Sequence, residues 1–263
     1  TEQLESGSET NIYVAFSTPF TFFGRKYSYT YVNYNGLLTF NQFSPDASLY
    51  PFPTYGTEDF IAPLWTDLDD FGLGRYSYQE YTSGSVLTRA TQDINQYFPH
   101  KGFSASWVFV ATWDYVESSD MNVLNLHSAP AITFQVVLIS GGDFSFILMN
   151  YGDCAVIQYQ VEAGYDTINS TDYYVIHYDA SYGNSIPNLK NTSNVNVPGR
   201  WAFLVNNGTE NVIGVKLKIR SLLDLTQRGN VEDVLQQIKQ ELVNYGVLRV
   251  FEIKLRNFKK TQP

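Results

Sequence analysis

The acidic run Thr66-Asp67-Leu68-Asp69-Asp70 is the part of the sequence best suited to bind a metal ion. Calcium takes several oxygen ligands, and closely spaced carboxylates supply them. The run lacks the central glycine and late glutamate of an EF-hand loop. Aspartates that follow a strand also form turns with their own backbone. Two hypotheses therefore stay open: calcium bound by Asp67, Asp69 and Asp70, or a turn without metal. No other cofactor is predicted.

Catalytic residues are not indicated by the sequence. The histidines, His100, His127 and His177, are far apart, and neither HExxH nor GxSxG occurs. Asp114 and Glu117 could in principle act as a glycosidase pair, but carboxylates at a strand end are usually solvated or capping groups. We therefore predict a protein that is not an enzyme.

Three Asn-Xaa-Ser/Thr sequons begin at Asn169, Asn191 and Asn207, in sequence that is typical of loops. Such short motifs often arise by chance, so each alone is a weak signal. If the protein is secreted, we expect at least two of the three asparagines to carry glycans.

Cys154 is the single cysteine, so the chain has no internal disulfide and no CxxC pair for zinc. A buried thiol behaves as a small hydrophobic side chain. An unpaired cysteine in a secreted protein suggests instead a disulfide to another chain. Both interpretations remain possible from sequence.

Charge divides the chain more clearly than composition does. Residues 1–211 carry 7 Lys and Arg against 21 Asp and Glu, a net charge of −14, and residues 212–263 carry 10 against 5, a net charge of +5. The overall charge of −9 argues against a nucleic-acid partner, because phosphate binding needs clustered basic residues. No segment has the roughly 18 consecutive apolar residues of a membrane-spanning helix.

The first part, residues 1–211, is predicted to form an antiparallel β-sandwich, because short runs of alternating apolar and polar residues are separated by turn residues. Aromatic residues, which favour strands, make up 16% of the chain. Asn35-Gly36 and the segment 140–143 are expected to form hairpin turns. Helical spacing of apolar residues predicts one helix over 85–97. Strands are predicted at 11–16, 27–34, 37–40, 61–68, 104–116, 131–139 and 144–151, with further short runs near 155–162, 173–178 and 201–205.

The last 52 residues predict a β-α-β unit. The segments 212–220 and 247–256 alternate apolar and charged residues, as half-buried strands do. Between them, Asn230 can cap a helix that ends near Gly246. The apolar faces of the two strands comprise Ile213, Val215, Leu217, Phe251, Ile253 and Leu255.

Several phrases in the first part follow one another in the order seen in the NIDO domain, the extracellular domain of nidogen, alpha-tectorin and certain membrane mucins. These are FTFFGRKYSYTYVNYNGLLTF, YPFP, IAPLWTDLD, VFVATWDYV, TFQVVLI, FILMNYG, EAGYD and NVNVPGRW. The chain resembles that family over roughly residues 11–206. The resemblance implies a mainly β fold, a secreted or cell-surface glycoprotein, and a structural or adhesive role without catalytic residues.

The domain prediction is therefore a polar segment at 1–10, a NIDO-like sandwich at 11–207, and a basic β-α-β unit at 208–263 that weakly resembles half of a SEA or ferredoxin-like domain. Two strands leave unpaired edges, so the unit is expected to pair with another chain or to lie against the acidic part. We predict an extracellular module for matrix or surface-coat assembly and adhesion, as a homo-oligomer or with other extracellular proteins. The alternatives are a lectin-like or calcium-dependent binding module and, third, a hydrolase.

Overall fold

The computed structural model divides the chain into two compact units, Thr1–Asn211 and Val212–Pro263. It describes residues 2–3, 11–41, 49, 51–68, 74–118, 131–155, 157, 159–181, 187–207, 233–238 and 241. None of the helices in these ranges is long and apolar enough to cross a membrane.

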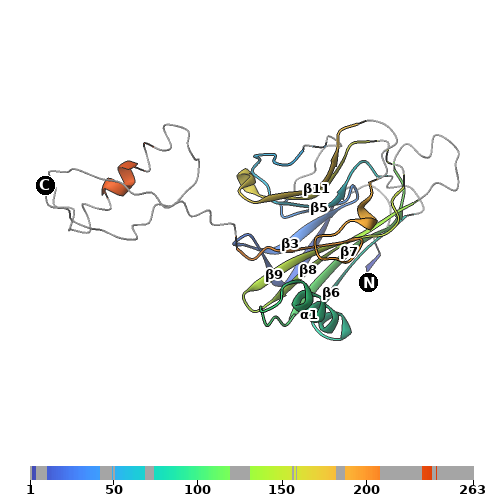
Figure 1. Cartoon of the computed structure of the whole chain (residues 1–263), viewed down its shortest axis with the longest axis horizontal. Coiled ribbons are helices and arrows are strands. Elements are labelled where there is room, and N and C mark those ends of the chain that lie inside the picture. The colour runs from blue at the N-terminus through green and yellow to red at the C-terminus, as the bar shows by residue number, and fades with distance from the viewer. Residues whose placement is uncertain are drawn as a thin grey trace. The chain divides into compact units, whose positions relative to one another are not determined.

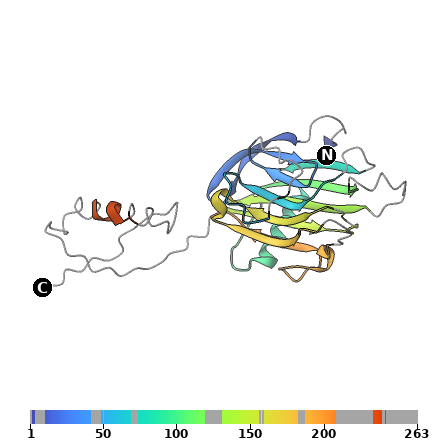
Figure 2. The ribbon, with the colours of Figure 1, turned by 90° about the horizontal axis from the view of Figure 1, so that it is seen from above.

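The first unit consists of two six-stranded antiparallel sheets packed face to face (Figure 1). Sheet 1 contains, in spatial order, β1 (Glu2–Gln3), β6 (Arg75–Tyr81), β7 (Trp107–Val116), β8 (Ile132–Gly141), β9 (Phe144–Tyr151) and β12 (Arg200–Leu204). Sheet 2 contains β11 (Tyr173–Asp179), β10 (Val161–Asp166), β5 (Phe60–Trp65), β4 (Leu37–Thr39), β3 (Arg25–Asn33) and β2 (Asn11–Phe22). Figure 2 shows the strands side by side from above. The predicted β-sandwich is confirmed.

The core lies between the sheets and is rich in aromatic rings. Alternate residues of β7 point inward, among them Trp107 and Trp113, and both are almost fully buried. The ring of Trp113 stacks on Phe134 of β8 with centroids 4.9 Å apart, and its indole nitrogen donates to the backbone oxygen of Tyr34 at 3.1 Å. The abundance of aromatic residues is thus explained largely by this core.

Helix α1 (Ser85–Tyr97) covers the outer face of sheet 1 (Figure 1). Ala90 and Ile94 form its buried stripe, as its helical spacing predicts. Polar contacts also hold the helix in place. Arg200 of β12 donates to Asp93 and to the hydroxyl of Tyr97, each at 2.9 Å. The part of the outer face of sheet 1 under α1 is therefore buried.

The loop between β3 and β4 differs from the predicted two-residue primed turn. Asn33 pairs with Leu37, so three residues form the loop, and of the Asn35-Gly36 pair only Gly36 has a positive φ, 83°. This matches the three-residue hairpin loop that ends in a left-handed residue. A Cβ at Gly36 would lie 1.9 Å from the Leu64 backbone oxygen, so the position also requires the small size of glycine.

Two predicted strands are shorter in the structure, because backbone groups at one end of each form hydrogen bonds with other segments. The predicted strand 61–68 ends at Trp65, since the backbone N–H groups of Thr66 and Leu68 donate to Asn35. The predicted strand 104–116 begins at Trp107, because the backbone N–H of Ala105 donates to the hydroxyl of Thr91 on α1 at 2.9 Å.

In the second unit, the described residues 233–238 and 241 are helical, within the predicted helix. Val234 and Ile238 are half-buried in this segment, whereas Asp233 is exposed. The two predicted strands, with Ile213, Val215, Leu217, Phe251, Ile253 and Leu255, lie outside the described residues.

Candidate functional site

Strand β11 forms one edge of sheet 2 and pairs only with β10 among the described strands. Its sequence is YYVIHYD, and four of its large side chains are exposed. The exposed fractions are 47% for Tyr173, 39% for Tyr174, 38% for Val175 and 40% for Tyr178. An edge strand with exposed apolar and aromatic side chains is a template for pairing with another chain. This β11 edge is the strongest candidate for a functional surface.

A bulge places three of these side chains on one face. Tyr173 pairs with Asp166, Val175 with Gly164 and Tyr178 with Glu162, and the register shifts between Ala163 and Gly164. Because directly paired residues share a face, Tyr173, Val175 and Tyr178 all lie on the outer face of sheet 2. Without the extra residue of the bulge, Tyr178 would point to the opposite face.

The opposite side of β11 closes one flank of the sandwich. The ring of Tyr174 lies 5.0 Å from that of Phe203 and 5.9 Å from that of Trp201, both on β12. Tyr165 of β10 also contacts Phe203, at 5.2 Å. This aromatic packing holds the edge strand in place, so its exposed side chains project from a rigid element.

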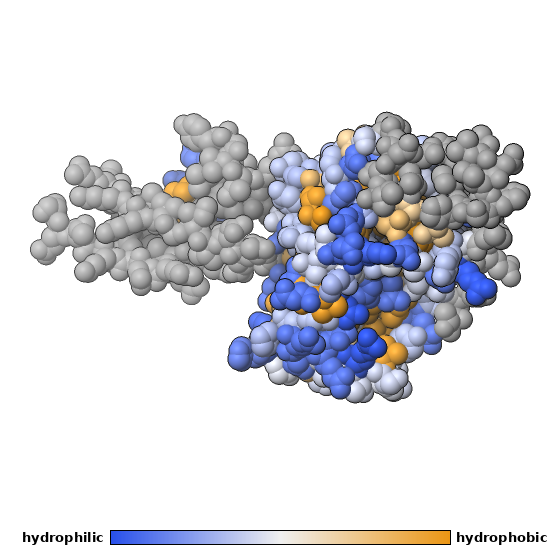
Figure 3. All heavy atoms as spheres, turned by 45° about the vertical axis from the view of Figure 1, so that its right-hand side comes forward, coloured by the Kyte–Doolittle hydropathy of each residue, from blue (hydrophilic) through white to orange (hydrophobic). Residues whose placement is uncertain are grey.

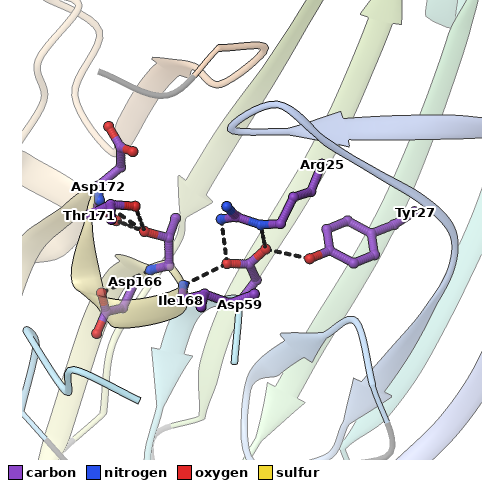
Figure 4. A network of polar contacts seen from close by, with 8 residues as sticks. Arg25, Tyr27, Asp59, Asp166, Ile168, Thr171 and Asp172 are labelled. Carbon is purple, nitrogen blue, oxygen red and sulfur yellow. Dashed lines mark hydrogen bonds and ion pairs between the residues drawn. The ribbon is translucent and has the colours of Figure 1, made fainter. Parts of the chain in front are cut away.

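A buried carboxylate, Asp59, fixes the loops beside this edge (Figure 4). Asp59 is 2% exposed and accepts two hydrogen bonds from the Arg25 guanidinium, at 2.6 and 2.7 Å. The hydroxyl of Tyr27 and the backbone N–H of Ile168, at 2.8 Å, also donate to it. These four bonds join β3, the start of β5 and the loop before β11, so Asp59 holds these three segments together.

A second buried carboxylate, Asp166, completes the attachment of that loop. It accepts bonds from the Thr54 backbone N–H at 2.7 Å, the Thr54 hydroxyl at 2.9 Å and the Ser170 hydroxyl at 2.9 Å. Asn169 donates its backbone N–H to Gly56 at 2.7 Å. We call the segments 54–59 and 166–172, joined by Asp59 and Asp166, the loop lock.

The loop lock holds residues in an unfavourable backbone region. Tyr55, Asn169 and Ser170 have φ values of 53°, 56° and 49°, which non-glycine residues adopt infrequently. Tyr55 is nevertheless 71% exposed, so its ring projects outward from a fixed backbone. Strained backbone kept in place by many bonds is typical of functional loops. The loop lock thus adds a further exposed tyrosine next to the segment that leads into β11.

Glu162 of β10 is an unusual member of the same sheet. It is completely buried, and neither carboxylate oxygen has a hydrogen-bond partner of good geometry. Its cross-strand neighbours on the same face are Trp65 and Tyr178. The pKa of Glu162 is raised to about 8, chiefly by burial; a hydrogen bond to the backbone of Phe52 opposes this shift and the nearby Asp166 adds to it. The carboxyl group is therefore mainly protonated at neutral pH.

The surroundings of β11 are acidic. Residues 102–189 contain no Lys or Arg at all, although they contain nine Asp and Glu. Asp172 directly precedes β11 and Asp179 ends it. His177 is the one basic side chain in β11. Burial lowers the pKa of this histidine, so it is neutral at pH 7. Of the acidic groups near β11, Asp172 is buried and Asp179 is half-buried, while Asp166 is bonded in the loop lock and Glu162 is mainly protonated.

The residues predicted to bind calcium are only partly described. Asp67 is half-buried between Thr66 and Leu68, whose backbone N–H groups donate to Asn35 at 3.2 and 3.1 Å. Asp69 and Asp70 lie outside the described residues. In the described ranges, no three His, Cys, Asp or Glu side chains come together as a metal site would need. Calcium at this run remains a prediction.

The remaining candidate groups are scattered across the sandwich. His100 is exposed after α1, His177 lies on β11, and His127 falls outside the described ranges. Asp114 accepts a bond from Thr133 at 3.3 Å on sheet 1, and Glu117 follows the end of β7. The described histidines thus lie on separate elements.

All three sequon asparagines, Asn169, Asn191 and Asn207, are exposed. Asn169 belongs to the loop lock, Asn191 to a 3₁₀ turn (Leu189–Asn191), and Asn207 follows β12. Their positions leave each side chain accessible on the folded surface.

Cys154 packs against the core, and burial raises its pKa to about 11, with Asp153 contributing further. Cys154 is half-buried, and since the thiolate is the reactive form, the raised pKa lowers the reactivity of this thiol at neutral pH. We expect native protein to react slowly with iodoacetamide at pH 7.5 and unfolded protein to react completely. Non-reducing electrophoresis of native material provides the second readout, where a band at a multiple of the monomer mass would show the interchain disulfide instead.

The face in Figure 3 is largely hydrophilic and carries only small, separate apolar areas among its described residues. Tyrosine combines an apolar ring with a polar tip, so a tyrosine-rich edge does not stand out by hydropathy. The sequence showed the strand-like run 173–178, but its position at the edge of a sheet depends on pairing between segments distant in sequence.

Known protein sequences are similar to this chain over most of its length. The model of the nidogen-like domain (NIDO) matches residues 28–207. Alpha-tectorin of Homo sapiens is 36% identical over 224 residues, which cover 78% of this chain and 10% of that protein. Nidogen of Drosophila melanogaster is 31% identical over 77% of this chain and 15% of its own length, and nidogen-2 of Mus musculus is 29% identical over 76% and 16%. No solved structure matches. The chain thus spans at most 16% of these relatives.

Proposed function

The chain belongs to the nidogen-like domain family, and we propose that it is a non-catalytic structural module of an extracellular matrix or surface coat, which acts through contacts between proteins. The observation that carries this proposal is the exposed, tyrosine-rich β11 edge on a family module whose buried Asp59 and Asp166 are fully engaged in holding loops. Their engagement leaves the surface side chains, and not a catalytic centre, to define the function.

The physical properties of the edge suit protein binding. Tyrosine offers a large contact area at a small cost in conformational entropy and a hydroxyl for hydrogen bonds. Tyr55, Tyr173 and Tyr178 present such rings from backbone that is already fixed, which reduces the entropy lost on binding. Sheet edges also offer main-chain hydrogen bonds, which give affinity without requiring a specific side chain.

The basic second unit, 212–263, is proposed to be the assembly element. Its charge of +5 contrasts with −14 for residues 1–211, so association between molecules brings opposite charges together. The test compares the molar mass of the full chain with that of a chain ending at residue 211, by light scattering at micromolar concentrations. The described core lies between residues 14 and 205, so the shorter chain retains it.

Concentration-dependent oligomers of the full chain and a monomeric truncation are the expected result. If both chains are monomeric, the assembly role of residues 212–263 is wrong. If both form the same oligomer, assembly depends on the first unit alone.

Secretion predicts glycans at the exposed sequons. Material secreted from animal cells should lose mass on enzymatic deglycosylation, and at least two of Asn169→Gln, Asn191→Gln and Asn207→Gln should each remove one glycan. Mass spectrometry of the intact protein measures this directly. Secreted protein of unmodified mass would contradict the glycoprotein part of the proposal.

A further inference from the structure

We propose that β11 of one molecule accepts residues 212–220 of a second copy as an additional antiparallel strand. This inference rests on the proposed assembly function and names the surface that the assembly element contacts. It would extend sheet 2 across the interface between molecules, with β11 as the acceptor.

The acceptor is selected by comparing the four edge strands of the two sheets. β1 has only two residues and pairs with β6, which contains Arg75. β12 contains Arg200, and β2 pairs with β3, which carries Arg25 and Lys26. β11 and its neighbour β10 contain no Lys or Arg. Of these edges, β11 presents the most exposed large apolar and aromatic side chains among the described residues.

The donor is selected by its sequence, VIGVKLKIR. Apolar residues alternate with Lys216, Lys218 and Arg220, which is the pattern of a strand that has one basic face. The proposed assembly function makes a second copy the source of this strand, and docking within one molecule is an outcome of the test.

Pairing of the two segments would provide main-chain hydrogen bonds and side-chain contacts for both. Main-chain hydrogen bonds would use the free side of β11, and the alternating side chains would set the register. Lysine side chains on the outer face would come beside Tyr173 and Tyr178, where an ammonium group is attracted to an aromatic ring. Asp179, which is half-buried at the end of β11, would add charge attraction.

The contact is heterologous, because the donor and the acceptor are different surfaces of the same chain. Such contacts produce rings when the rotation closes and open filaments when it does not. Either product would suit a module of a matrix or coat, and the distinction appears in the molar mass at increasing concentration.

The experiment measures molar mass by light scattering for full-length variants, with thermal melting to confirm folding. Val175→Lys places a positive charge on the exposed outer face of the acceptor and is expected to raise the dissociation constant at least about tenfold. Ala15→Lys places the same charge at an exposed position of β2, the opposite edge of sheet 2. This control variant is expected to leave the dissociation constant unchanged. The donor variant Lys216→Glu with Lys218→Glu is expected to weaken assembly similarly.

Combining Val175→Lys with the two donor substitutions should restore assembly, because the swapped charges attract again. Oligomers that tolerate Val175→Lys would overturn the inference while leaving the assembly function intact. A full-length chain that is monomeric before any substitution would contradict the assembly function itself. A monomer in which Val175→Lys changes the protection of β11 would show docking within one molecule, and it would also overturn the inference.

Discussion

Replacing Asp59 with alanine is expected to lower the free energy of unfolding by about 3 kcal/mol, because it leaves a partly buried guanidinium without its partner. Asp59 accepts four hydrogen bonds from Arg25, Tyr27 and Ile168, so the substitution removes the connection between two strands and the loop before β11. The side chain of Arg25 is 34% exposed, which allows partial hydration and keeps the loss below that of a fully buried pair. Urea unfolding followed by fluorescence measures the change.

Asp153→Ala is the matched control, since Asp153 also pairs with a basic residue. That pair, with Lys190, is on the surface, where the side chain of Asp153 is 83% exposed. Exposed pairs contribute little to stability, so the control should cost less than about 1 kcal/mol. Equal effects of the two substitutions would show that the Asp59 network does not hold the loops.

The second large effect concerns Glu162 and pH. Its pKa is about 8 in the folded protein against 4.5 for an ordinary glutamate, so the folded state binds the proton more tightly. As pH rises, the unfolded chain releases the proton first, and the free energy of unfolding falls between about pH 4.5 and pH 8. Each pKa unit corresponds to about 1.4 kcal/mol, so the loss across this window is a few kcal/mol and at most about 5 kcal/mol.

Glu162→Gln removes the titrating group while keeping its shape, so the variant should gain stability relative to the wild type as pH increases from 5 to 8. Urea unfolding at several pH values gives this difference directly. Glu117→Gln makes the same chemical change at a half-exposed position and serves as the control for the substitution itself. A constant difference between wild type and Glu162→Gln would mean that the buried carboxyl keeps an ordinary pKa.

Local patterns were sufficient to predict much of the sandwich. The hairpin β8–β9 and helix α1 lie where alternation and helical spacing placed them, because each is encoded by contiguous residues. Strand β6 was not predicted, since RYSYQEY lacks aliphatic residues and gains its place by pairing with β7. Strand β2 extends beyond the predicted 11–16, because a register shift near Phe20 lets it continue beside β3.

The candidate site was less predictable, because its parts meet only in the folded chain. Asp59 and Asp166 are 107 positions apart and come together through the bonds of the loop lock. Their roles depend on buried donors such as Arg25, which no local motif identifies. The sequons and Cys154 could be found in the sequence, whereas exposure of the asparagines and burial of the thiol required the fold.

Hydrogen exchange of the β11 backbone amides tests most directly whether this edge is the contact surface. The full chain would be measured by mass spectrometry at a concentration where it is assembled and, after dilution, where it is monomeric. Peptides covering Tyr173–Asp179 should exchange more slowly in the assembled state, while those from the opposite edge strand, β2, should be unchanged. Equal exchange of β11 in both states, with oligomers still present, would contradict the account.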